Sequence, residues 1–236
     1  MRQLFFIYLI FLLPAVLTVA QEKTTIYFIP GLGTDYRIFA QMELEDRYSV
    51  KYLHYVTPPK NTSMKAYAHI LAEQIDTSSN YIIVGASLGG MLATEMAEFM
   101  SPEKTILIAS AKSRYELPYL YRFQKVIPIQ KVIPGKLIKS STQFLRKIVE
   151  PAANNQNDIY TDMLNKKDPV FMKRAVDMIV NWKRTEYAEE IIHIHGNNDN
   201  TLPIRRVKPN YVIENGSHVM ALTKSKEISE LFKIIL

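Results

Sequence analysis

The chain has 236 residues, a formal net charge of +6 and no cysteine. This length suits one domain with a buried core, and a hydrophobic content of 47% argues against intrinsic disorder. The lack of cysteine excludes disulfides, thiolate zinc sites, a cysteine nucleophile and a lipid-modified cysteine.

The N-terminal twenty residues are typical of an export signal. Arg2 precedes the apolar run LFFIYLIFLLPAVL, and Ala20 ends the segment with a small residue, as signal peptidase requires. We expect residues 1–20 to be removed before Gln21, which leaves one domain over residues 21–236 and an exported protein, periplasmic or secreted. The alternative is an uncleaved membrane anchor, although the run is short for a span and contains Pro14.

Positive charge is concentrated in one stretch. From Lys112 to Glu150 the chain has nine Lys or Arg against two Glu, a balance of +7. No nucleic-acid-binding module accompanies these residues, so nucleic acid is not an expected partner. We expect a solvated surface here, and peripheral contact with anionic lipid is the alternative.

Short apolar strands are predicted to alternate with helices. The predicted strands are Thr24–Pro30, Tyr48–Val56, Tyr81–Val84, Lys104–Ser110, Ile191–Gly196 and Tyr211–Gly216. The predicted helices are Asp35–Met42, a segment starting at Met64 behind a cap at Asn61, Thr62 or Ser63, Gly89–Met100 and Lys224–Ile235. This order predicts an α/β fold, with a mostly parallel sheet covered by helices on both faces.

The alternation stops between Lys112 and Glu190. This stretch has no convincing strand, and QKVIP occurs in it twice. We predict helices at Lys139–Val149 and from Pro169 to Trp182, the second with Asp168 as its N-cap. Residues 112–190 are therefore predicted to form a helical cap inserted into the sheet domain.

The motif Gly85-Ala86-Ser87-Leu88-Gly89 lies between a predicted strand and a predicted helix. In this context the glycines allow a sharp turn that exposes a serine hydroxyl at the helix N-terminus. Ser87 is thus the candidate nucleophile. The structural alternative is a small residue packed at a tight turn.

A serine nucleophile needs a base, and the base needs a carboxylate. The chain has five histidines: His54, His69, His193, His195 and His218. Only His218 follows a late strand through a Gly-Ser turn, which makes it the candidate base. Asp199, in the loop HGNNDNTLP, is the candidate acid, with Glu214 as the competing carboxylate. His195, at the end of the preceding strand, either lines the acid's loop or has a direct role in the chemistry.

The backbone N–H groups of Leu32 and Leu88 are the candidate oxyanion-hole donors. Leu88 directly follows the nucleophile, and Leu32 lies in the turn Pro30-Gly31-Leu32-Gly33. A dinucleotide-binding loop would need glycine where Tyr36 stands, and no phosphate-binding Gly-Lys-Ser/Thr or metal-binding His-Glu-x-x-His motif occurs. We therefore expect neither a cofactor nor a metal.

The segments IPGLGTDYRIF, VGASLGG, HGNNDNTLP and IENGSHVM resemble the oxyanion loop, nucleophile elbow, acid loop and histidine loop of the α/β-hydrolase fold family. The resemblance spans Thr24 to Leu236. It implies a serine hydrolase that works through an acyl-enzyme, with Ser87, His218 and Asp199 as its triad.

The chain departs from the family pattern in three ways. Pro30 stands where many members have histidine, the family's first antiparallel strands have no counterpart, and only nineteen positions separate Asp199 from His218. The short spacing implies that a helix between the acid and the histidine is reduced or lost. The positioning of Asp199 is the point that this departure brings into question.

Aromatic residues after a strand end suggest an apolar acyl pocket. Tyr115, Tyr119 and Phe123 are the candidate substrate contacts, and cap core is the alternative. The expected substrate is a small-molecule carboxylic ester, with lysophospholipids and thioesters as alternatives. Two non-enzymatic alternatives are a ligand-binding protein on the hydrolase fold and a membrane-tethered interaction protein.

Overall fold

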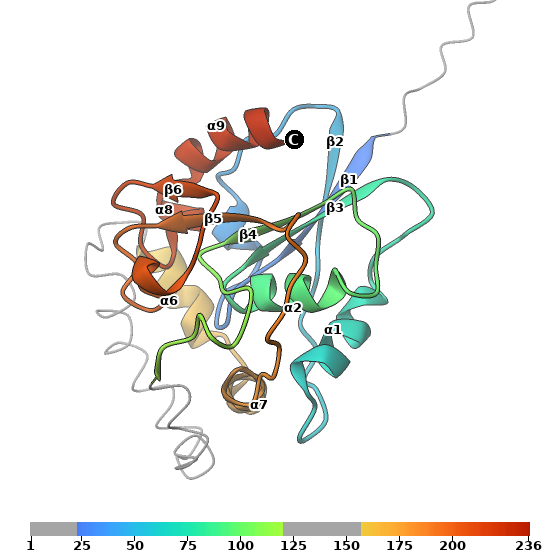
Figure 1. Cartoon of the computed structure of the whole chain (residues 1–236), viewed down its shortest axis with the longest axis vertical. Helices are drawn as coiled ribbons and strands as arrows, with labels where there is room; N and C mark the ends of the chain where they lie inside the picture. Colours follow the sequence, from blue (N-terminus) through green and yellow to red (C-terminus); the bar gives the residue numbers. More distant parts are fainter. Residues whose placement is uncertain (1–22, 120–156) are drawn as a thin grey trace, which may run out of the picture.

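The computed structural model describes residues 23–119 and 157–236. Six strands form one sheet in the order β2-β1-β3-β4-β5-β6, and all five neighbouring pairs are parallel (Figure 1). The strands are β1 (Thr24–Ile29), β2 (Tyr48–Tyr52), β3 (Tyr81–Ala86), β4 (Lys104–Ile108), β5 (Ile192–Gly196) and β6 (Tyr211–Ile213). The predicted parallel sheet is confirmed, and the described part of the chain adds no antiparallel strand to it.

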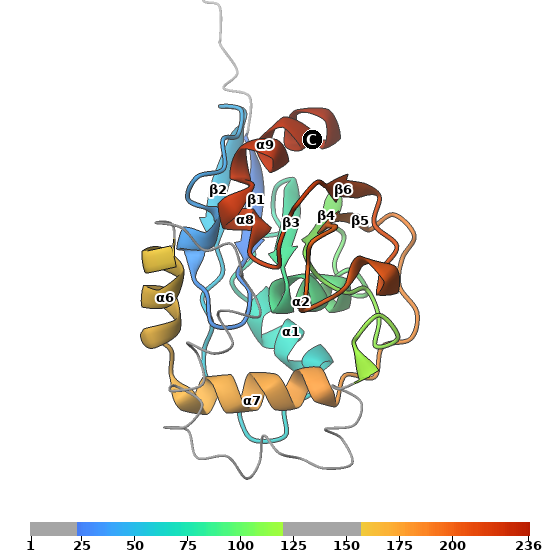
Figure 2. The ribbon, with the colours of Figure 1, turned by 90° about the vertical axis from the view of Figure 1, so that its left-hand side faces the viewer.

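Helices cover both faces of this sheet. The helical elements are η1 (Tyr36–Phe39), α1 (Met64–Ala72), α2 (Leu88–Met96), α6 (Asn157–Asn165), α7 (Pro169–Val180), η2 (Ile204–Arg206), α8 (Met220–Thr223) and α9 (Ser225–Ile235). Helices α1 and α2 lie on one face, and α8 and α9 lie on the other (Figures 1 and 2). Within residues 23–119 and 157–236, no helix has the length and apolar character that a membrane crossing needs.

Successive side chains of the central strands point to opposite faces of the sheet, and this divides the core into two halves. In β1, Tyr27 and Ile29 pack with α1 and α2, whereas Ile26 and Phe28 pack with the helices of the opposite face. All four side chains are almost completely buried. A strand with both faces covered needs a continuous apolar run, which explains the sequence TTIYFI.

Local chemistry sets where several elements begin. Of the three predicted caps for α1, Ser63 is the one used, and its hydroxyl accepts a hydrogen bond from the Ala66 N–H at 3.1 Å. The predicted helix Asp35–Met42 is only the 3₁₀ turn η1, capped by Asp35. Strands β2 and β6 end four and three residues earlier than predicted, at Tyr52 and Ile213.

Helices α6 and α7 lie in the stretch predicted as a cap, between β4 and β5. Asp168 caps α7 as predicted, because its carboxylate accepts from the N–H groups of Val170 and Phe171. The predicted helix Lys139–Val149 lies outside the described residues, as does most of the basic stretch. The extent of the cap therefore stays a prediction.

A buried ion pair ties the chain after α7 to helix α2. The Arg184 guanidinium makes two hydrogen bonds of 3.0 Å to the Glu95 carboxylate, and Trp182 donates to the same group from Nε1 at 2.7 Å. The side chain of Glu95 is only 4% exposed. A carboxylate buried to this degree needs its cation, because water does not replace the lost interactions.

We expect Arg184→Met to lower the free energy of unfolding by about 3–5 kcal/mol, since it leaves Glu95 charged, buried and without its cation. Urea denaturation followed by circular dichroism measures this loss. Glu98→Gln is the matched control: Glu98 also pairs with Arg184 but is 44% exposed, so we expect a loss below about 1 kcal/mol. Equal losses in the two variants would contradict the argument.

Candidate active site

Ser87 lies between β3 and α2 in a backbone conformation that residues with a side chain rarely adopt. Its φ is 50° and its ψ is −116°. A side-chain carbon on Gly85 would lie 2.3 Å from the Gly89 carbonyl oxygen, and one on Gly89 would lie 2.1 Å from that of Ile29. The two motif glycines are therefore required by close backbone packing, which makes the turn at Ser87 sharp enough to expose its hydroxyl.

The backbone of Ser87 is held by the end of the neighbouring strand β4 and by the residues that follow it. The Ser87 N–H donates to the Ile108 carbonyl at 3.0 Å, and the buried hydroxyl of Ser110 donates to the Ser87 carbonyl at 2.6 Å. Sequence reasoning did not identify Ser110 as a support of the nucleophile. Its position just past the end of a strand next to β3 was the available signal.

Three residues distant in sequence meet at the carboxyl ends of the strands. Ser87 Oγ lies 2.8 Å from Nε2 of His218, and Nδ1 of His218 lies 2.8 Å from Oδ2 of Asp199. His218 is in the turn between β6 and α8, and Asp199 is in the loop after β5. The geometry matches a nucleophile, a base and an orienting acid.

The Asp199 carboxylate is buried, and both of its oxygens accept hydrogen bonds. Its Oδ1 accepts from the N–H groups of Thr201 and Leu202, both at 2.8 Å. Burial by itself raises the pKa of Asp199, but the charge and hydrogen bond of His218, together with the Leu202 N–H, bring this pKa below its usual value. Asp199 therefore stays ionised at neutral pH and can stabilise an imidazolium.

The acid loop and the histidine loop pack directly on each other. A side-chain carbon on Gly196 would lie 2.0 Å from the Gly216 carbonyl oxygen, which also accepts from the Asn198 N–H at 3.0 Å. The competing carboxylate, Glu214, is exposed and bonded to the side chain of Asn197 at 2.6 Å. The spacing of nineteen residues thus still allows Asp199 to reach His218.

Two further histidines form a buried chain behind Asp199. His195 donates from Nε2 to the Leu202 carbonyl at 2.8 Å, so its Nδ1 is the acceptor of the Nε2 proton of His193, 3.2 Å away. His195 Nε2 is 3.5 Å from Asp199 Oδ2. Burial lowers the pKa of both imidazoles, that of His193 well below 6.5. The two remaining histidines, His54 and His69, are exposed.

The predicted oxyanion-hole donors flank the nucleophile. Leu88 is the first residue of α2, where a helical N–H has no partner within the helix. Leu32 follows Gly31, and a side-chain carbon on Gly31 would lie 3.2 Å from Cβ of Ser87. The loop after β1 therefore lies against the nucleophile, as an oxyanion hole requires.

The predicted substrate contacts are only partly within the described residues. Tyr115 and Tyr119 are 59% and 61% exposed, and the Arg206 guanidinium lies 4.2 Å from the ring centre of Tyr119. Phe123 lies outside the described residues. The acyl pocket therefore stays a prediction.

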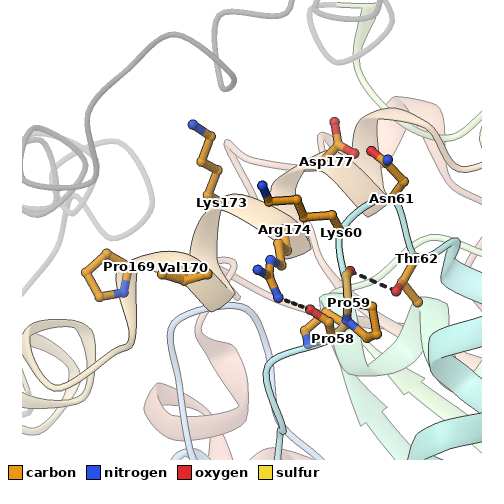
Figure 3. A pocket seen from close by; sticks show the side chains of 10 residues that line it. All are labelled: Pro58, Pro59, Lys60, Asn61, Thr62, Pro169, Val170, Lys173, Arg174 and Asp177. Atoms are coloured by element: carbon orange, nitrogen blue, oxygen red, sulfur yellow. Dashed lines mark hydrogen bonds between the residues drawn. The ribbon is translucent and has the colours of Figure 1, made fainter.

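A pocket of about 420 Å³ lies elsewhere, between α7 and the chain after β2 (Figure 3). Its lining includes Pro58, Lys60, Lys173 and Arg174. None of Ser87, Asp199 and His218 lines it. The Arg174 guanidinium donates to the Pro58 carbonyl there. Among residues 23–119 and 157–236, no cluster of three or more His, Asp or Glu side chains is arranged to hold a metal ion.

We expect the free energy of unfolding to fall as pH decreases from about 7 to 5. His193 and His195 have folded pKa values below 6.5, so the unfolded chain takes up protons in this range that the folded chain does not. Asp199 adds a separate loss only in the acidic range near and below its unfolded pKa.

Urea denaturation at a series of pH values measures this slope. His193→Gln removes one of the two buried imidazoles and is expected to flatten it. His54→Gln changes an exposed histidine and should leave it unchanged. Equal slopes for wild type and His193→Gln would contradict the assignment.

No family model matches the chain, and no curated protein matches its sequence. Solved structures do match its fold. A lipase-esterase related protein from Clostridium acetobutylicum is 15% identical with a TM-score of 0.67, over 92% of this chain and 96% of that one. A thermophilic esterase from Thermogutta terrifontis is 14% identical with a TM-score of 0.67, over 89% and 88% of the two chains.

A thioesterase of the prodiginine pathway in Streptomyces coelicolor, RedJ, is also similar. It is 14% identical with a TM-score of 0.60, over 89% of this chain and 85% of that one. Identities this low establish the architecture alone. Together with the parallel sheet and the strand-to-helix turn at Ser87, they show that this chain has the α/β-hydrolase fold.

Proposed function

We propose that this protein is a serine hydrolase that cleaves carboxylic esters with an apolar acyl group. The observation that carries the proposal is the alignment of Ser87 Oγ, the His218 ring and the Asp199 carboxylate, with two contacts of 2.8 Å. The similarity of the fold to esterases supports the same conclusion.

In the first half of the reaction, Ser87 Oγ attacks the ester carbonyl while its proton passes to Nε2 of His218. The carbonyl oxygen becomes an oxyanion that the N–H groups of Leu32 and Leu88 stabilise. The tetrahedral intermediate collapses when the bond to the alcohol oxygen breaks. His218 returns the proton to this oxygen, which releases the alcohol and leaves an acyl-enzyme.

In the second half, a water molecule attacks the acyl-enzyme and gives a proton to His218. Collapse of the second intermediate releases the carboxylic acid, and the proton returns to Ser87. Throughout, Asp199 accepts the Nδ1 proton of His218 in a hydrogen bond and stabilises the imidazolium. These steps require no cofactor and no metal.

A thioester is the second candidate substrate. One protein of similar structure, RedJ, is a thioesterase, and the attack on a thioester carbonyl uses the same groups. A hydrolysis screen of p-nitrophenyl esters and acyl thioesters, both graded by acyl length, separates these candidates. The ester assignment predicts the higher kcat/KM on esters, with an optimum at apolar acyl chains.

Export is part of the proposal, with residues 1–20 as its signal. Contact of the basic stretch, residues 112–150, with anionic lipid is the alternative to a solvated surface, and most of that stretch lies outside the described residues. N-terminal sequencing of exported protein tests the signal: a start near Gln21 supports cleavage. An intact N-terminus in the membrane fraction would favour the anchor instead.

We expect a fluorophosphonate probe to label wild-type protein and not Ser87→Ala, since the probe reacts only with an activated serine hydroxyl. Ser101→Ala is the matched control, because it removes an exposed serine, and it should label like wild type. Mass spectrometry locates the adduct. A folded but unlabelled wild type would favour a ligand-binding protein.

We expect His218→Ala to lower kcat by about 10³-fold or more, because it removes the general base. His195→Ala should cost far less, since His195 faces the Leu202 carbonyl rather than the nucleophile. Steady-state kinetics measure both variants, and comparable losses would mean that the base is misassigned.

A further inference from the structure

The direction of the Leu32 N–H is set by the carbonyl on the other side of the same peptide bond. In a planar trans peptide, the C=O and the N–H point in opposite directions, and no described peptide bond is cis. The Gly31 carbonyl accepts two hydrogen bonds from Thr34, from its N–H at 3.1 Å and from its hydroxyl at 3.0 Å. Thr34 therefore fixes which way the Leu32 N–H points.

Thr34 is in turn held by the turn between α6 and α7. The Lys167 ammonium donates to the Thr34 carbonyl at 2.6 Å. Thr34 is buried and Lys167 is half-buried. A hydrogen bond from a charged donor in such a place is stronger and more directional than a neutral one on the surface.

Other contacts fix α6 against the same loop. Gly33 has a φ of +79°, and a side-chain carbon there would lie 2.6 Å from Cδ2 of Leu164. The Asp35 N–H contacts Sδ of Met163 at 3.4 Å, and Arg37 pairs with Asp162 at 2.7 Å. The loop after β1 and helix α6 thus form one packed unit.

The backbone around Lys167 is fixed from a second side. Asp168 caps α7 and also accepts a hydrogen bond of 2.7 Å from the Thr57 hydroxyl, beyond the end of β2. The neighbouring Lys166 differs: its side chain is 66% exposed and pairs with Asp162, one turn back on α6. Two adjacent lysines therefore have different surroundings, and only one contacts the loop.

We propose that Lys167 and Thr34 are positioning residues for the oxyanion hole, with Lys167 holding Thr34 and Thr34 aiming the Leu32 N–H at the reacting oxygen. Neither residue touches the substrate. The inference rests on the proposed hydrolase function and adds that residues from the inserted stretch take part in stabilising the transition state.

Thr34→Val and Lys167→Met test this in the full chain. Valine preserves the shape of threonine and the backbone N–H but removes the hydroxyl, and methionine preserves most of the lysine stem. We expect kcat on a p-nitrophenyl ester to fall by about 10-fold or more, less than the loss of a whole oxyanion-hole donor, with KM changed by less than about 2-fold. Thr34→Ser should recover most of the activity, and Lys166→Met should match wild type.

A trifluoromethyl ketone provides the second readout, because its adduct with the serine carries an oxyanion. Its inhibition constant should rise in parallel with the loss in kcat/KM across the variants. Unchanged kcat in both variants would overturn the inference. A lower kcat with unchanged affinity for the ketone would overturn it as well, since general damage to the fold then explains the loss.

The wild type separates this inference from the function on which it rests. Wild-type turnover and probe labelling, combined with unaffected variants, would leave the hydrolase proposal intact and remove only the positioning roles. A wild type that neither turns over esters nor reacts with the probe would remove both.

Discussion

The turn at Ser87 is the constraint on which the rest of the site depends. A backbone with φ of 50° and ψ of −116° costs about 1–3 kcal/mol, and it persists only where the surroundings leave no other choice. Here the surroundings are the glycines on each side of the turn and two hydrogen bonds to the Ser87 backbone, one with Ile108 at the end of β4 and one with Ser110 just beyond it. The sheet, the turn at Ser87 and helix α2 together hold the hydroxyl at the carboxyl ends of the strands, where a base can reach it.

His218, the proposed base, reaches this hydroxyl because the last two loops share one rigid support. Gly196 and Gly216 touch without side chains between them, so the acid loop and the histidine loop have little freedom to separate. The Thr201 and Leu202 N–H groups orient the Asp199 carboxylate, and the buried histidines behind it keep water from that side. The hydrogen bond between His218 and Asp199 is therefore in place before any substrate binds. Preorganised charges and dipoles of this kind are what electrostatic stabilisation of a transition state relies on.

The structure brings together three candidate residues whose positions the strand pattern predicted. Ser87 comes directly after β3, and Asp199 and His218 lie in the loops after β5 and β6. Parallel strands bring their carboxyl ends to one edge of the sheet, which is why these residues meet. The hydrogen bond from Lys167 to Thr34 joins residues 133 positions apart and leaves no periodic signal in the chain. Element ends also escaped prediction: residues 53–56 were expected to continue β2, but the strand ends at Tyr52.

Helix α7 connects the two elements that carry the proposed oxyanion-hole donors. Before it, Lys167 contacts the loop that contains Leu32; after it, Arg184 pairs with Glu95 on α2, the helix that begins with Leu88. The two contacts are of different kinds, a charge-assisted hydrogen bond to a carbonyl and a buried ion pair, but each links the inserted stretch to an element that carries one donor. Because packed helices transmit displacement with little compression, a shift of α7 would change the distance between the two N–H groups. On this argument the inserted stretch belongs to the proposed catalytic geometry.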